Sequence, residues 1–231
     1  MQSFDWAEFR RGTIDILPVV AVALPIGLLF GTLAAGRGLS AAEAGLMSAS
    51  VFAGASQFVA IELWKTPAPW ALLTLTAFVV NIRHILMGAS FARQLGSFPP
   101  STRLPSMFFL ADEIWAFSER RALSGPVPPE YYWGMGLALW AQWVVGTILG
   151  AIVGTSLGDP ATYGLDFAFT AMFICILSSF WRGWRTGAVL LASGVVAAVA
   201  KLTIPGAWYI VLGGLAGVAV AYAFGEDETA A

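Results

Sequence analysis

Charged residues are scarce in this sequence. Only 11% of its 231 residues are Asp, Glu, Lys or Arg, whereas an ordinary soluble domain contains roughly 25%. Hydrophobic residues make up 58% of the chain, and a soluble fold of this length cannot hide so many apolar side chains in its core. The hydrocarbon of a lipid bilayer removes this limit, so the composition predicts an integral membrane protein.

Basic stripes, cysteine pairs and metal-ligand clusters are also missing. Twelve basic residues stand against 14 acidic ones, a net charge of −2, so no nucleic-acid partner is expected. The single cysteine, Cys175, lies in an apolar run and cannot form an intrachain disulfide, and we interpret it as a small buried hydrophobic residue. No Cys/His cluster has metal-ligand spacing, so neither a metal nor another cofactor is expected.

Apolar segments recur along the chain between short polar breaks. A helix needs about 20 residues to cross the hydrocarbon core, and we predict an all-α polytopic membrane protein with about 7–8 transmembrane helices, some of them broken or short. The segments 104–117 and 186–200 are short, and either could be re-entrant or a thin crossing. The predicted spans are residues 13–33, 44–63, 70–91, 104–117, 131–154, 165–180, 186–200 and 205–224.

No linker is long enough to separate two domains, so residues 1–231 are expected to form a single transmembrane domain. Residues 1–12 mix aromatic and charged side chains and suit the headgroup level, residues 225–231 form an acidic C-terminal tail, and tryptophans such as Trp140 and Trp143 fit interfacial belts. Each half carries apolar pairs joined by tight breaks, which would suit an inverted repeat, although no convincing self-similarity of residues accompanies it.

Basic residues in the loops favour a cytoplasmic N-terminus. With eight crossings, seven Lys or Arg fall on the N-terminal side and four on the other. The seven are Arg10, Arg11, Lys65, Arg120, Arg121, Arg182 and Arg185, and the four are Arg37, Arg93, Arg103 and Lys201.

Small and polar residues interrupt the second predicted span. Gly54, Ala55 and Ser56 remove side-chain bulk, and Gln57 and Phe58 follow them. One interpretation is close helix packing. The other is a helix broken near the midplane, whose exposed N–H groups and dipole suit a substrate carboxylate.

The third predicted span contains Asn81, Arg83 and His84, the only histidine. An arginine at this depth is costly, by about 2.5–3.5 kcal/mol on insertion scales, and should therefore pair with a carboxylate or a substrate anion. The pair could equally be structural and lock two helices. His84 could couple transport to protons, or it could be a hydrogen-bonded neighbour of the arginine.

Asp112 and Glu113 form the third cluster, in the short segment 104–117. Adjacent helical residues point about 100° apart, so both carboxylates cannot face one partner equally. One could hold Arg83 while the other faces a substrate ammonium or a proton. Alternatively, the segment lies near the interface and both carboxylates are solvated.

In this order and spacing, the clusters resemble the AzlC family, the large subunit of branched-chain amino-acid exporters. The resemblance covers nearly the whole chain. It implies export of hydrophobic amino acids such as valine, leucine or isoleucine across a bacterial inner membrane, together with a small AzlD-type membrane subunit. The matching pieces are Gly12 through Pro25-Ile-Gly27, Gly-Ala-Ser-Gln-Phe at 54–58, Asn-Ile-Arg at 81–83, Asp-Glu at 112–113, Trp-Val-Val-Gly-Thr at 143–147 and Leu-Asp-Phe at 165–167.

We therefore predict a secondary exporter in the lipid bilayer, coupled to protons or membrane potential. The expected substrate-binding residues are Gly54, Ala55, Ser56, Gln57, Phe58, Asn81, Arg83, Asp112 and Glu113, and the expected coupling residues are His84, Asp112 and Glu113. A phosphate-binding loop and the common hydrolase motifs are missing from the sequence, so an enzyme is not expected. The alternative is a channel or a structural subunit of a larger transport complex.

Overall fold

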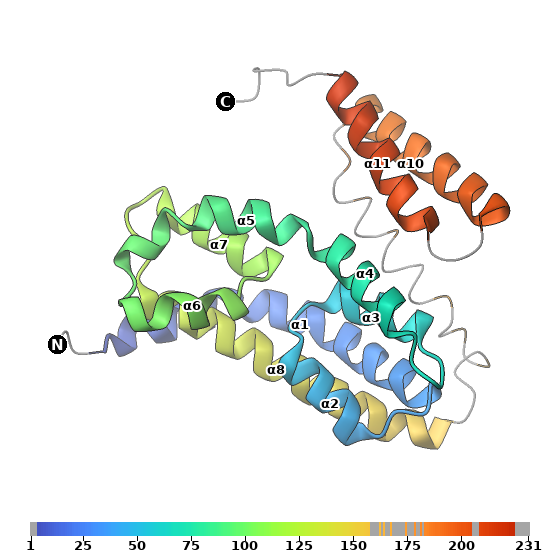
Figure 1. The fold of residues 1–231 in the computed structure, drawn as a ribbon. Helices are drawn as coiled ribbons and strands as arrows, with labels where there is room; N and C mark the ends of the chain where they lie inside the picture. Colours follow the sequence, from blue (N-terminus) through green and yellow to red (C-terminus); the bar gives the residue numbers. More distant parts are fainter. Residues whose placement is uncertain are drawn as a thin grey trace. The chain divides into compact units, whose positions relative to one another are not determined.

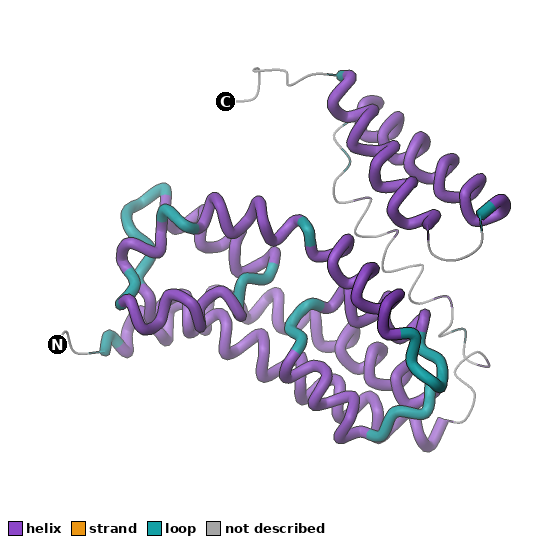
Figure 2. Tube along the Cα trace, viewed as in Figure 1, coloured by secondary structure: helices purple, strands orange, loops and turns teal. Residues whose placement is uncertain are grey.

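A computed structural model describes residues 4–157, 162, 164, 167, 174, 178, 181, 183–204 and 208–224. Over this part of the chain every regular element is a helix, which confirms the all-α prediction (Figure 2). Cys175, Arg182, the acidic tail and most of the predicted span 165–180 lie outside the described residues. The chain divides into two compact units: Met1–Pro69 with Val80–Asp166, and Trp70–Val79 with Phe167–Ala231.

The first unit is organised around two long helices, α1 (Trp6–Gly36) and α8 (Pro129–Leu157). They run parallel, because Gly12 lies against the Tyr131 backbone near both N-termini and Gly31 lies against the Thr147 backbone near both C-termini. A Cβ atom at either glycine would overlap a carbonyl group of the other helix, so glycine permits this close approach. α1 continues as one helix through Pro18 and Pro25.

Local sequence signals start the first helices. Asp5 caps α1 by accepting hydrogen bonds from the N–H groups of Ala7 and Glu8. Ser40 and Glu43 form a capping box at the start of α2 (Ala41–Ser50). Hydrogen bonds from the Ser40 side chain and backbone hold the pKa of the Glu43 carboxyl below its ordinary value, so this exposed cap persists as the pH falls toward that lowered pKa.

The second predicted span, 44–63, is not one helix. α2 ends at Ser50, and α3 (Gly54–Leu63) begins after the non-helical residues 51–53. α2 runs antiparallel to α8, whereas α3 returns toward the end of α1, where Arg37 forms a salt bridge of 3.2 Å with Glu62. Each half has 10 residues, about 15 Å of helix, which is half the thickness of the hydrocarbon core. The segment therefore folds as a hairpin of two short helices in place of one long helix (Figure 1).

A second hairpin enters from the opposite end of the first unit. It consists of α6 (Pro100–Phe108) and α7 (Asp112–Ala122), which fill the predicted short span 104–117. The Ser106 carbonyl of α6 accepts a hydrogen bond of 2.8 Å from Tyr132 in the first turn of α8. α7 returns to the same end, where Arg121 forms a salt bridge of 3.7 Å with Glu8. Of the two expectations for this segment, the re-entrant one agrees with the structure.

The third predicted span is also divided. α4 (Trp70–Asn81) and α5 (Arg83–Phe91) meet at Ile82 with a bend of 44°. α5 leads toward the N-terminal end of α8, where the Phe91 and Tyr132 rings stack with centroids 4.9 Å apart. A short 3₁₀ helix, Gln94–Ser97, then leads to α6.

The second unit contains α10 (Trp184–Thr203) and α11 (Trp208–Ala223), which pack antiparallel through Gly213 and Gly217. α10 has 20 residues, so the expectation that residues 186–200 form a short span was wrong, because the helix extends into its polar ends. Among the described residues α1, α8 and α10 are long and apolar enough to cross a membrane, and the bent pair α4/α5 is a fourth candidate. A polytopic helical fold is confirmed, and the number 7–8 stays a prediction.

The α1–α8 contact generates a stability prediction. Gly31→Ala and Gly150→Ala should each lower the free energy of unfolding by about 1–3 kcal/mol, because the added methyl group overlaps backbone of the facing helix. Thermal unfolding of the purified protein in detergent measures this.

Gly194→Ala in α10 is the matched control, because nothing lies within 4 Å of a Cβ built at that position. That substitution should be neutral or stabilise the helix by up to about 1 kcal/mol. Equal melting temperatures for all three variants would contradict the proposed role of the glycine contact.

Candidate functional site

Three helices begin close together inside the first unit, and we call this region the break cluster: the starts of α3, α5 and α7 at Gly54, Arg83 and Asp112. None of the three helix starts has a side-chain cap. The two hairpin tips meet here, because the Phe52 ring lies 6.2 Å from the Phe108 ring and 6.3 Å from the Phe109 ring, measured between centroids. Helix starts without caps leave N–H groups and the positive end of the dipole for a ligand.

A buried chain of hydrogen bonds fixes the first break in place. The Trp143 indole donates to Gln57 Oε1 at 2.8 Å, and Gln57 Nε2 donates to Ser48 Oγ at 3.0 Å. The Ser48 and Thr147 hydroxyls share a further hydrogen bond of 2.8 Å. Gln57, Ser48 and Thr147 are fully buried, so this network ties both halves of the hairpin to the middle of α8.

Aromatic rings pack behind the same helix start. A Cβ atom on Gly54 would lie 3.2 Å from the Trp143 ring, so the small residue lets the backbone approach the indole closely. Phe58 is 1% exposed and packs edge-on against Phe30, whose ring stacks on Trp143. Phe58 thus belongs to a packed aromatic group at the rear of the break cluster.

Asn81 connects the bent helix pair to α3. Its Nδ2 group donates to Ser56 Oγ at 3.1 Å, and the Ser56 hydroxyl donates to the Ala53 carbonyl at 3.0 Å. Asn81 Oδ1 is buried and has no hydrogen-bond partner. His84 Nδ1 lies 3.1 Å from the carbonyl oxygen of Asn81, so the imidazole is anchored to the backbone at the bend.

Arg83 connects α5 to α7. Its Nη2 atom lies 2.9 Å from Asp112 Oδ2, and the two side chains are 37% and 46% exposed. Arg83 Nε is buried without a hydrogen-bond partner. Glu113, the next residue, is exposed and forms no salt bridge in the described part of the chain. The two adjacent carboxylates therefore have different surroundings, as helical geometry requires.

The structure brings most of the predicted site residues to one region but gives them different contacts. Gly54, Ser56, Asn81, Arg83 and Asp112 lie at the break cluster. Ala55 occupies the first turn of α3 and is half-buried. The amide of Gln57 is fully occupied within the protein.

Sequence reasoning missed Trp143, Ser48 and Thr147. Trp140 and Trp143 were assigned to an interfacial belt, which was wrong, because both indoles donate hydrogen bonds to the first hairpin near the middle of α8. The available signal was the presence of hydroxyl residues inside apolar segments, where a polar side chain needs a partner.

These elements first define the class: a multi-pass helical membrane protein whose apolar segments are interrupted next to polar residues such as Arg83 and Asp112. A family model described as AzlC protein matches residues 18–157, the part that contains both hairpins and most of α1 and α8. The chain belongs to the AzlC family. It is thus a membrane protein, and no solved structure matches it.

Curated relatives agree with this assignment. The chain is 31% identical to the inner membrane protein YgaZ of Escherichia coli, over 86% of this chain and 84% of that protein. It is 32% identical to the branched-chain amino acid transport protein AzlC of Bacillus subtilis, over 76% of this chain and 69% of that protein. It is also 33% identical to an uncharacterized membrane protein of Archaeoglobus fulgidus, over 83% and 84% of the two chains.

The buried network predicts that Gln57→Leu destabilises the protein by about 1–3 kcal/mol, because Trp143 loses its hydrogen-bond acceptor and Ser48 keeps only its bond with Thr147. Thermal unfolding in detergent measures this effect.

Gln142→Leu is the matched control, because both amide atoms of Gln142 are buried and have no hydrogen-bond partner. Its removal should leave stability unchanged or raise it. A Gln57 variant as stable as the Gln142 variant would mean that the network contributes little.

Proposed function

We propose that this protein is a secondary transporter subunit that exports branched-chain or other hydrophobic amino acids from the cytoplasm, coupled to protons or membrane potential. A small AzlD-type membrane protein is the proposed partner. The name of the Bacillus subtilis relative supports branched-chain amino acids as the substrate class. The break cluster supports a transporter, because helices interrupted in the bilayer interior commonly form substrate sites in such proteins.

The observation that carries this proposal is the half-exposed ion pair of Arg83 and Asp112. Phe91 packs against Tyr132 at the end of the first unit where α8 begins. Arg83 lies eight residues before Phe91 in α5, which is about 12 Å of helix at 1.5 Å per residue. Arg83 is therefore well removed from that end of the unit. A solvated ion pair on a protein surface contributes little free energy, whereas charges at bilayer depth are costly and face a cavity or a partner. The Arg83–Asp112 pair is half-exposed, so both of its charges are accessible to a charged ligand.

In the proposed site, the substrate carboxylate binds the free N–H groups at the start of α3 and the Arg83 guanidinium. The ammonium group binds Asp112 or Glu113, both in the first turn of α7. Asn81 positions the Ser56 end of α3 through its hydrogen bond. Gln57 and Phe58 hold α3 from behind and complete the set of proposed binding residues.

Coupling is proposed to run through the same carboxylates and His84. A proton on Asp112 removes the negative partner of Arg83, and the freed guanidinium can then attract the substrate carboxylate. His84, whose ring contacts the Asn81 carbonyl at the bend, is the third proposed coupling residue.

The proposed orientation places the N-terminus in the cytoplasm. In the first unit, six basic residues lie at the end where α1 and α8 begin and two lie at the other end. This bias favours a cytoplasmic N-terminus. The six are Arg10, Arg11, Arg93, Arg103, Arg120 and Arg121, and the two are Arg37 and Lys65.

Export assays test the central ion pair. Arg83→Ala and Asp112→Asn should each reduce the initial rate of L-leucine efflux from loaded vesicles by about tenfold or more, because each variant loses a charge-assisted contact. Stereoselective counterflow that saturates would separate a transporter from a channel.

Arg37→Ala is the control, since it removes a salt bridge of similar length at the base of the first hairpin. That variant should retain export. Undiminished efflux by Arg83→Ala would exclude the central role of the arginine.

Cysteine labelling tests the orientation and the hairpins together. In a Cys175→Ser background, which has no other cysteine, a membrane-impermeant maleimide added to intact cells should label Lys65→Cys and spare Arg103→Cys. If residues 44–63 and 104–117 each crossed the membrane, the chain would make five crossings by the end of α8. Lys65 would then face the cytoplasm and Arg103 the outside, so the labelling pattern would be reversed.

A further inference from the structure

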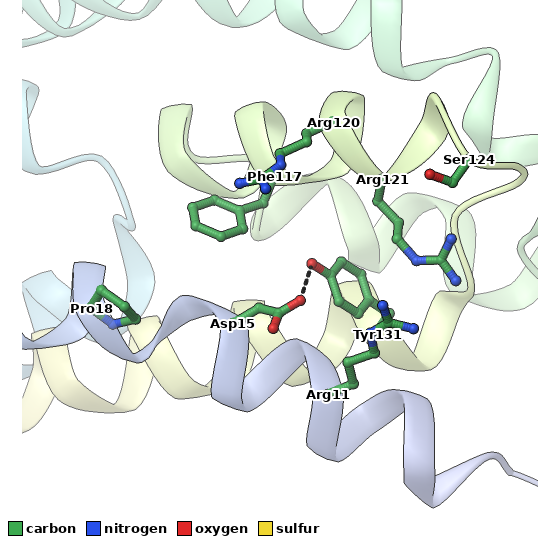
Figure 3. A pocket seen from close by; sticks show the side chains of 8 residues that line it. All are labelled: Arg11, Asp15, Pro18, Phe117, Arg120, Arg121, Ser124 and Tyr131. Carbon is green, nitrogen blue, oxygen red and sulfur yellow. Dashed lines mark hydrogen bonds between the residues drawn. The ribbon is translucent and has the colours of Figure 1, made fainter.

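A second polar site lies away from the break cluster, at the end of the first unit where α1 and α8 begin. It is a cleft of about 470 Å³ between α1, α7 and the first turn of α8 (Figure 3). This volume is within the range of about 300–1,000 Å³ that small-molecule sites occupy. The sequence clusters did not include its residues as a binding site.

Three arginines line the cleft, and only two of them form salt bridges within the described residues. Arg11, Arg120 and Arg121 line it. Glu8 pairs with Arg11 at 3.8 Å and with Arg121 at 3.7 Å. Arg120 forms no salt bridge within the described residues, and Arg121 Nε is buried without a hydrogen-bond partner. The arginines can therefore donate to an added carboxylate in charge-assisted hydrogen bonds.

Asp15 supplies the opposite charge in the same cleft. Its Oδ2 atom accepts a hydrogen bond of 2.9 Å from the Tyr131 hydroxyl, which fixes the carboxylate in position. None of the three cleft arginines forms a salt bridge with Asp15 in the described part of the chain. The carboxylate thus keeps its charge available for a cation other than arginine.

Apolar groups complete the cleft. Pro18 lies one turn beyond Asp15 on α1, and Phe117 lies one turn before Arg121 on α7. Figure 3 shows Pro18 on one side of Asp15 and Arg11 on the other. Anion donors, a cation acceptor and an apolar surface therefore follow one another across a single cleft.

We propose that this cleft binds a zwitterionic amino acid with an aliphatic side chain and recruits it from the cytoplasm. The carboxylate binds Arg120, the ammonium group binds Asp15, and the side chain lies against Pro18 and Phe117. This inference rests on the proposed function for its substrate class and for the side of the membrane. An anionic lipid headgroup would satisfy the arginines but would leave Asp15 without a role.

Equilibrium binding of tritiated L-leucine to the full chain in lipid nanodiscs tests the proposal. The Arg83→Ala background isolates the cleft from the break cluster. In that background, Arg120→Gln and Asp15→Asn should each weaken binding by about tenfold or more. The Asn oxygen can still accept the Tyr131 hydrogen bond, so the second change removes only the charge. Arg10→Gln, which removes a charge from the same end of α1 outside the cleft, should bind as tightly as the background protein.

Two leucine analogues test the two ends of the ligand. 4-Methylpentanoate lacks the ammonium group and 3-methylbutylamine lacks the carboxylate, so both should compete with L-leucine at least about tenfold more weakly than unlabelled L-leucine does. If 4-methylpentanoate competed as strongly as leucine, the cleft would be an anion site and not a zwitterion site. If an anionic lipid competed as strongly as leucine, the cleft would be a lipid site.

The outcomes separate this inference from the proposed function. Leucine binding and export by the wild-type chain, with no binding in the Arg83→Ala background, would overturn the cleft and leave the exporter standing. Binding that depends on Arg120 and Asp15 in a protein that does not export would support the cleft and refute the exporter. A wild-type chain that neither binds nor exports leucine would overturn both.

Discussion

The contact between α1 and α8 is the constraint on which the rest of the first unit depends. Two long helices can run parallel at backbone contact only where side chains are absent, and glycines such as Gly12, Gly31 and Gly150 meet carbonyl groups of the facing helix. Thr32 adds a hydrogen bond of 3.1 Å to the Gly150 carbonyl. Because the two helices begin at the same end, the chain between them must return to that end. A bent helix pair and two hairpins meet this requirement.

The two hairpins bring polar backbone into the interior of an apolar protein, and the polar side chains are distributed accordingly. Behind α3, every polar atom of the Gln57 side chain is bonded, which holds the break rigidly. In front of it, Asn81 and Arg83 each keep one buried atom without a partner, and the ion pair with Asp112 is half-exposed. Buried polar groups without partners are costly, and a ligand at the break cluster could contribute the bonds that these two atoms lack.

Several features of this site could be predicted from the sequence because they follow from local chemistry. Three small residues in a row from Gly54 suited either close packing or a broken helix, and the structure has both, a break at residues 51–53 and a close approach of Gly54 to Trp143. An arginine in an apolar run needs a counter-charge, and Arg83 has one in Asp112. The path of the chain could not be predicted in this way, since 20 apolar residues with a central break suit a crossing and a hairpin equally well. The packing against α8 distinguishes the two.

The sequence by itself determined that this is a helical membrane protein, which residues are too polar for lipid, and which family it belongs to, because composition and local patterns carry that information. Only the tertiary structure decided that the second and fourth apolar segments are hairpins, that Trp143 is part of a buried network, and that Arg120 and Asp15 share a cleft. These features depend on contacts between residues far apart in the chain, such as Trp143 with Gln57. Such contacts leave no local pattern, because each partner is an ordinary residue until the fold brings the two together.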